Sequence, residues 1–226
     1  ALDRRNLKAG VDSMSKRYSP YFELYAQYVV QMGEVGSDVF YKNLDAFLTD
    51  SVMNEVYDTV QRQFPNLNKL EADLTGAFER FGAQFPDYPV PRVLASVSGF
   101  NQSIVVGDSV IGIALDKYLG ASSTFYQQLA IHNYKRATMI PQRIASDVML
   151  AFALTEFPFN DSVDNLLSSM IFEGRALYFT KQMLPNVPDS LIIGYSAQQL
   201  RWCKINEAAM WTFLAEQRLL FNLDRL

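Results

Sequence analysis

The spacing of apolar residues changes near residue 90, and this change limits the fold more than any other feature of the chain. Before it, bulky apolar residues recur every three or four positions, which is typical of helices that bury one side. Between 92 and 115, β-branched residues instead form three short runs, separated by 99–102 and by 107–109. Helical spacing returns after Pro141. The pattern predicts a predominantly helical α+β fold, with helices packed around a small antiparallel sheet.

Capping residues indicate where the helices begin. Before the sheet, Asp50 or Ser51 is suited to cap a helix that runs through Arg62, and Asn66 a helix that ends before Pro86. After it, a loop-rich stretch reaches Ile140. Later helices are predicted over 142–156, from Asn160 or Asp161 to Met183, and from Ser196, in a capping box with Gln199, to about Phe221. We expect a single domain over 1–226, with a helical N-terminal part (1–87) and a second part (88–226) that contains the sheet.

The composition excludes several classes of function. The chain has one histidine, His132, and one cysteine, Cys203, so a zinc site built from two or three such ligands is nearly excluded. We interpret His132 as a loop or core residue and Cys203 as a small buried hydrophobe, and we predict no metal and no cofactor. The 20 Lys and Arg against 24 Asp and Glu argue against nucleic acid as a partner. The longest apolar run, Val148 to Leu154, is too short to span a membrane as a helix.

Four carboxylates lie in apolar helical segments and are candidates for acid–base chemistry: Asp147, Glu156, Glu173 and Glu207. A carboxylate in such a segment lies at a solvated edge or is held by a cation such as Arg143, Arg175 or Arg201. Arg143 and Asp147 are four residues apart on one predicted helix, so they can pair without an active site. A structural ion pair is therefore the expected role of each.

Several longer motifs resemble one known family. They are the segments 91–94 (PRVL), 98–101 (SGFN), 112–120 (GIALDKYLG), 170–179 (MIFEGRALYF), 188–190 (PDS) and 199–203 (QLRWC), followed by Asn206, Glu207 and Trp211. In this order, and over nearly the whole chain, they are similar to the gliding-motility lipoprotein B (GldB) family of Bacteroidetes. Members of that family are envelope lipoproteins, anchored through a lipidated cysteine after a signal peptide.

The resemblance implies a location and two missing segments. It implies a lipoprotein that faces the periplasm or is anchored in the outer membrane, with its lipid anchor outside residues 1–226. The family also continues past this end with a segment rich in Pro, Gly, Arg and Trp. We therefore expect that the chain is truncated or that its tail is not included.

The same family is similar, more remotely, to zinc metallopeptidases that have HExxH on one helix and a glutamate ligand on the next. Glu173-Gly174-x-Ala176-x-x-Phe179 matches the segment that holds this glutamate. The helix predicted over 142–156 occupies the position of HExxH and contains no histidine. The resemblance thus implies a zinc-peptidase-like (gluzincin-like) architecture without the histidine pair.

These observations predict a non-catalytic, envelope-anchored lipoprotein domain, related to gliding motility or secretion, that binds an envelope protein or peptide. Its degenerate cleft is expected around Glu173, Arg143 and Asp147, and by analogy Ser98, Asn101 and Tyr118 line its rim. Other motif residues are expected to be structural, with the last four packed in the core: Asp116, Tyr178, Trp202, Asn206, Glu207 and Trp211.

Two other functions stay open. The first is a hydrolase acting on a peptide or glycan in the cell envelope, with Glu173 and either Asp147 or Glu207 as acid and base. The second is a structural subunit that docks through an apolar surface stripe. A large exposed aromatic patch outside the cleft would favour this second possibility.

Overall fold

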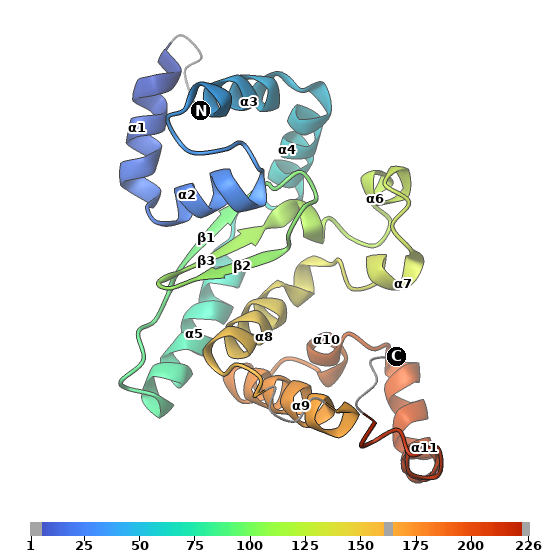
Figure 1. The fold of residues 1–226 in the computed structure, drawn as a ribbon. Coiled ribbons are helices and arrows are strands. Elements are labelled where there is room, and N and C mark those ends of the chain that lie inside the picture. Colours follow the sequence, from blue (N-terminus) through green and yellow to red (C-terminus); the bar gives the residue numbers. More distant parts are fainter. Residues whose placement is uncertain (1–5, 161–164, 223–226) are drawn as a thin grey trace.

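The first half of the chain is helical in the computed structural model, which describes residues 6–160 and 165–222 (Figure 1). Its helices are α1 (Leu7–Tyr18), α2 (Tyr21–Leu24) with a π-helical turn (Tyr25–Val29), α3 (Asp38–Thr49), α4 (Ser51–Gln63) and α5 (Asn68–Gln84). Asp50 caps α4 as predicted, since its Oδ1 accepts the backbone N–H groups of Val52 and Met53 at 2.8 and 3.0 Å. The cap position of α5 is Leu67, one residue after the predicted Asn66.

The sheet consists of β1 (Arg92–Ser96), β2 (Ile104–Gly107) and β3 (Val110–Ala114), in the order β1-β3-β2. β2 and β3 form the predicted antiparallel hairpin. The prediction of a wholly antiparallel sheet is wrong, because β1 pairs with β3 in parallel. After β1 the chain crosses to the far edge before it enters the hairpin, so β3 runs beside β1 in the same direction. Runs of β-branched residues indicate strands but not their order in a sheet.

Helices return after the sheet. A 3-10 turn (Leu115–Tyr118) leads into the expected loop-rich stretch, which also contains two short helices, α6 (Thr124–Gln128) and α7 (Asn133–Arg136). A 3-10 turn (Pro141–Arg143) then opens α8 (Ile144–Glu156), and α10 (Asp189–Ile193) follows α9 (Leu166–Met183). The cap of α9 is Asn165 rather than Asn160, and the alternative, Asp161, lies outside the described residues. The predicted capping box of Ser196 and Gln199 is confirmed at the start of α11 (Ala197–Glu216).

Two clusters of buried apolar residues hold these elements together. The main cluster joins α4 and α5 to β3, α8 and the end of α9, and includes Phe81, Ile111 and Met149. The smaller cluster lies among α1, α2 and α3, around Phe40. Since α4 and α5 belong to the main cluster, the core extends across residue 87, where the sequence changes character. The structure is predominantly helical α+β, as predicted, and none of its described helices is long and apolar enough to span a membrane.

Candidate functional site

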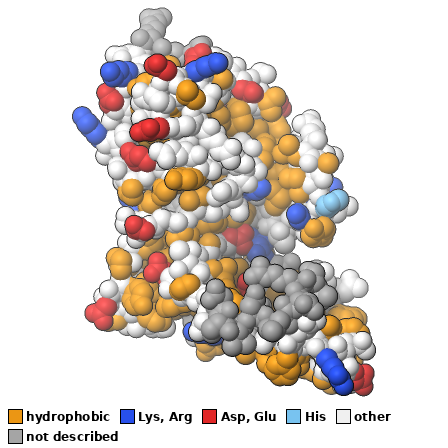
Figure 2. Space-filling model, in the orientation of Figure 1, with side chains coloured by type: hydrophobic (Ala, Val, Ile, Leu, Met, Phe, Trp, Pro, Cys, Tyr) orange, Lys and Arg blue, Asp and Glu red, His pale blue; other side chains and the backbone are white. Residues whose placement is uncertain are grey.

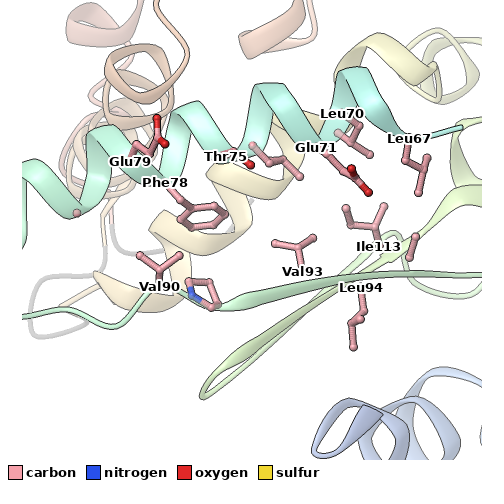
Figure 3. A pocket seen from close by; sticks show the side chains of 14 residues that line it. Leu67, Leu70, Glu71, Thr75, Phe78, Glu79, Val90, Val93, Leu94 and Ile113 are labelled. Carbon is pink, nitrogen blue, oxygen red and sulfur yellow. The ribbon is translucent and has the colours of Figure 1, made fainter. Parts of the chain in front are cut away.

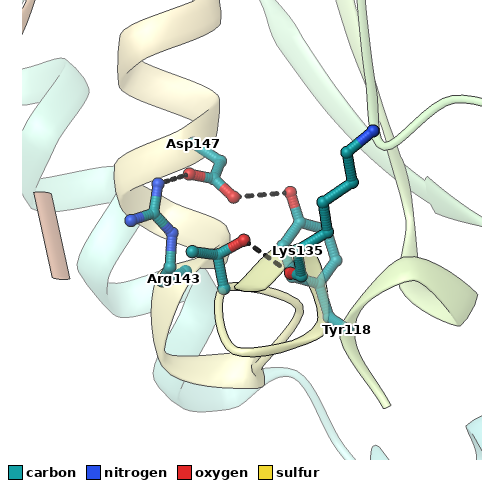
Figure 4. A network of polar contacts seen from close by, with 5 residues as sticks. Tyr118, Lys135, Arg143 and Asp147 are labelled. Atoms are coloured by element: carbon teal, nitrogen blue, oxygen red, sulfur yellow. Dashed lines mark hydrogen bonds and ion pairs between the residues drawn. The ribbon is translucent and has the colours of Figure 1, made fainter. Parts of the chain in front are cut away.

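Arg143, Asp147 and Tyr118 form a polar network at the start of α8 (Figure 4). Arg143 ends the 3-10 turn and Asp147 lies one helical turn later, so their side chains project on the same side. Nη2 of Arg143 lies 2.6 Å from Oδ1 of Asp147. The hydroxyl of Tyr118 donates to the other carboxylate oxygen at 3.0 Å. Both oxygens of Asp147 are thus occupied by neighbours from its own fold.

Burial controls the ionisation of this network. It raises the pKa of Asp147 above its usual range, and the opposing effects of the Arg143 charge and of the bonds from Arg143 and Tyr118 do not cancel it. Burial and the nearby carboxylate of Asp147 also raise the pKa of Tyr118, which keeps its phenol protonated. The guanidinium of Arg143 lies against Gly194, whose added Cβ would come within 2.3 Å of Nη1. Its Nε and Nη1 have no hydrogen-bond partner in the described part of the chain.

A second polar cluster centres on Asp116, which is fully buried. Its carboxylate accepts the backbone N–H of Ser98 at 2.9 Å, the hydroxyl of Ser98 at 3.1 Å and the backbone N–H of Phe100 at 2.5 Å. Gly99 and Phe100 both have left-handed backbones, with φ of 68° and 65°. Asp116 therefore fixes the tight turn by which the chain leaves β1.

Ser98 and Asn101 belong to this turn. The hydroxyl of Ser98 also accepts the backbone N–H of Asn101 at 3.1 Å. The Asn101 side chain donates to the carbonyl of Val29 at 2.6 Å, which ties the turn to the end of the π-helical segment. Asp116, Ser98 and Asn101 thus belong to one hydrogen-bonded unit, in which Asp116 has a structural role. The sequence alone did not predict this unit. Its one available signal was a carboxylate, Asp116, two residues after the end of the buried strand β3.

Glu173 lies apart from both clusters. It is exposed on α9, and within the described residues it makes no hydrogen bond or ion pair. The structure therefore brings Arg143, Asp147 and Tyr118 together, and Ser98 with Asn101, but does not join Glu173 to either group. Glu207 lies on α11 beside a small hollow of about 280 Å³ that it shares with Met170 of α9 and Cys203.

The expectation that the motif residues of α11 pack in the core is wrong. Trp202 and Trp211 are 58% and 44% exposed, and Glu207 is exposed as well. Asn206 donates to the carbonyl of Trp202 within the same helix, at 2.8 Å. No residue of α11 is buried, because no other described element covers the helix. Helical apolar spacing indicates a face that seeks burial, and it does not distinguish a core from an interface.

The exposed apolar side chains concentrate in this region. Of the nineteen large ones that the structure describes, eleven lie between 166 and 222. Hydrophobic side chains are visible along the lower edge of the molecule in Figure 2. We call this the α9–α11 surface and define it by Met170, Ile171, Tyr178, Trp202, Ile205, Met210, Trp211 and Phe213. Tyr178, another motif residue, is 67% exposed within it. Large exposed apolar patches commonly mark interaction sites.

The donor groups do not fit a zinc site. In the described ranges, no three His, Cys, Asp or Glu side chains are placed to hold a metal ion. The sides of α8 that face the core carry Ile144, Val148, Met149 and Phe152, none of which is a zinc ligand. His132 stacks on Tyr134 beside α7, with ring centroids 5.9 Å apart.

Comparison with known proteins gives one match. The family model of the gliding motility protein GldB, a lipoprotein family, matches residues 2–226. No curated protein and no solved structure matches the chain significantly, so the remote likeness to zinc peptidases stays a prediction. The match spans nearly every residue and agrees with the motifs in the sequence. The chain therefore belongs to the GldB family, and it is an envelope-associated lipoprotein related to gliding motility.

Proposed function

We propose that this chain is a non-catalytic interaction domain that holds another envelope protein through the α9–α11 surface. The observation that carries the proposal is the exposure of α11: a helix with large apolar residues on several sides and no buried residue. Large apolar side chains that gather on an exposed surface commonly mark a site where another molecule binds. Because the described elements leave α11 uncovered, a partner that covers it supplies the missing contacts.

The residue types of this surface favour a protein as the partner. Trp202, Trp211, Tyr178 and Met210 are types that are enriched in protein interfaces, and Arg201 lies beside them on α11. Aromatic side chains and arginine also dominate the binding energy of such interfaces. Burying one side chain the size of Leu or Phe is worth about 1.5–3 kcal/mol. A few anchors on α11 therefore suffice for a specific complex.

The polar residues support the non-catalytic part of the proposal. Asp147 is engaged by Arg143 and Tyr118, and Asp116 holds the turn after β1. Glu173 on α9 makes no hydrogen bond or ion pair with any described residue. The likeness to zinc metallopeptidases is a prediction from the sequence, and we propose that the framework of this chain serves as a scaffold. In this proposal the partner binds the α9–α11 surface and not the degenerate cleft that was expected around Glu173.

The hydrolase alternative loses support for its pairing of Glu173 with Asp147. It needs an acid and a base placed on either side of one bond, with one carboxylate free to act. Asp147 is paired with an arginine, and within the described residues no contact brings it near Glu173. Zinc-dependent peptide hydrolysis by the purified chain, lost in Glu173→Gln, would nevertheless overturn the non-catalytic part of the proposal.

Photo-crosslinking in living cells tests the interaction part. A benzophenone amino acid replaces Ile205, which is 81% exposed, and a control protein carries it at the exposed Asp58 of α4. We expect position 205 to give one discrete crosslinked envelope protein that position 58 does not give. Crosslinks only to lipid or to a second copy, or equal patterns from the two positions, would contradict the proposal.

A further inference from the structure

A groove lies between α5 and β1, with Ile113 of β3 also in its lining (Figure 3). It has a volume of about 640 Å³. In the figure, Phe78 points from α5 toward the strand and Val93 points from β1 toward the helix. Leu70 and Leu74 also line it from the helix. The groove is thus apolar and runs along the length of one strand.

The strand that borders this groove is an edge strand. In the part of the chain that the structure describes, β1 pairs only with β3, and the backbone N–H of Arg92 donates to the carbonyl of Ser109 on that side. In a parallel pair of strands, every second residue directs both its N–H and its C=O to the adjacent strand. Arg92 and Leu94 therefore face β3, and the N–H and C=O groups of Val93 and Ala95 face the open side. No backbone bond from the rest of the described chain reaches these two residues.

Both ends of the free edge are closed. Pro91 is the next residue before Val93 whose backbone would face the open side, and proline has no N–H to donate. At the other end, the carbonyl of Val97 accepts the hydroxyl of Tyr25 at 2.6 Å. The open edge is therefore limited to Val93 and Ala95, which matches an extended segment of about three to five residues.

The charges around the groove indicate which kind of peptide segment would bind there. Its lining includes two acidic residues, Glu71 and Glu79, and no Lys or Arg. Figure 3 shows the Glu71 carboxylate directed toward the space between helix and sheet. Among the described residues Glu71 has no ion pair, whereas the nearby Asp73 is paired with Lys69 at 2.8 Å. A lysine or arginine on the bound segment would form an ion pair with Glu71.

From these observations we propose that the groove binds an extended peptide segment of another protein as an added strand of the sheet. Its backbone pairs with Val93 and Ala95, its apolar side chains enter between α5 and β1, and a basic residue faces Glu71. This site involves none of the residues of the α9–α11 surface. It adds a second contact to the proposed interaction role and does not depend on the first.

The test measures binding of a fluorescein-labelled, capped heptapeptide of alternating Val and Thr with lysine at both ends, by fluorescence anisotropy with the whole chain. Ala95→Pro removes one outward N–H at an exposed residue, and Ala95→Thr keeps it. We expect binding by the native chain, binding within about twofold of it by Ala95→Thr, and at least fivefold weaker binding by Ala95→Pro. A peptide N-methylated at the positions that face β1 is expected not to bind.

Two further variants keep the test decisive if Ala95→Pro does not fold. Thr75→Trp fills the groove from the exposed face of α5, with Thr75→Ala as its control, and Glu71→Lys reverses the charge. Both Thr75→Trp and Glu71→Lys should weaken binding at least fivefold.

Equal binding of the N-methylated and plain peptides, or no binding of either, would overturn the proposal. A dimer of the chain that Thr75→Trp disperses would identify a second copy as the occupant and would also overturn it. An Ile205→Glu variant that still binds the peptide separates this site from the α9–α11 surface.

Discussion

Nη2 of Arg143 lies 2.6 Å from Oδ1 of Asp147 across one turn at the start of α8, and only about a tenth of the Arg143 side chain is exposed. Replacing Arg143 by Met keeps the apolar stem and leaves the carboxylate buried without its cation. We expect the free energy of unfolding at pH 7 to fall by about 2–4 kcal/mol. Urea denaturation measures the change. Lys69→Met, which breaks the exposed Lys69–Asp73 pair of the same spacing, should cost less than about 0.5 kcal/mol. Equal losses in the two variants would contradict the assigned role.

The raised pKa of Asp147 gives the stability of the chain a pH dependence. Below the ordinary aspartate pKa of about 3.9 the carboxyl is protonated in both states. As pH rises from there through the raised pKa, the unfolded state loses its proton first, so the folded state loses stability relative to it. The stability of the native chain should therefore fall relative to that of Asp147→Asn across this window. Urea denaturation of both proteins in steps from pH 3.5 to 7 tests this, and a relative gain with rising pH would show that the pKa is lowered instead.

Asp116 holds the turn after β1 by accepting two backbone N–H groups and a hydroxyl. Asp116→Asn replaces one acceptor by a donor, which then faces another donor in a buried site. The expected loss is about 2–4 kcal/mol in the free energy of unfolding, together with faster hydrogen exchange at the Phe100 amide. The control is Asp108→Asn at the exposed hairpin turn, which should change little. Unchanged exchange at Phe100 would contradict the assignment.

Gly112 lies where β3 passes close to α2. A Cβ there would come within 2.1 Å of the Tyr21 ring, whereas a Cβ at Gly174 of α9 meets nothing within 4 Å. Gly112→Ala should lower the free energy of unfolding by about 1–3 kcal/mol, because Tyr21 must move and lose its 2.7 Å hydrogen bond with Ser96. Gly174→Ala should raise it by up to about 1 kcal/mol, since alanine favours helix. Thermal unfolding of both variants measures the contrast, and similar melting temperatures would refute it.

Local signals in the sequence predicted much of the fold. Asp50 and the Ser196–Gln199 capping box act within a few residues of themselves, so the starts of α4 and α11 could be read directly. The β2–β3 hairpin is local in the same sense. The parallel pairing of β1 with β3 could not be read, because it depends on where the chain goes after Ser98 and hence on the buried Asp116.

The candidate site was predicted only in part. Arg143 and Asp147 are four residues apart on one helix, and their pairing followed from that spacing. The position of Glu173 depends on how α9 packs, which no local pattern specifies. Trp202 and Trp211 were expected in the core because apolar spacing is the same whether a helix face meets its own chain or a partner.

Movement of cells over agar tests the central claim, that the α9–α11 surface and not a carboxylate site carries the function. A gliding strain that lacks the gene receives either Ile205→Glu/Phe213→Glu or Glu173→Gln, with matched protein levels and melting temperatures. Both substituted α11 side chains are largely exposed, so the fold should persist. We predict that the α11 variant fails to restore gliding while Glu173→Gln restores it fully. Normal gliding with the α11 variant, together with loss of gliding in Glu173→Gln, would contradict the account.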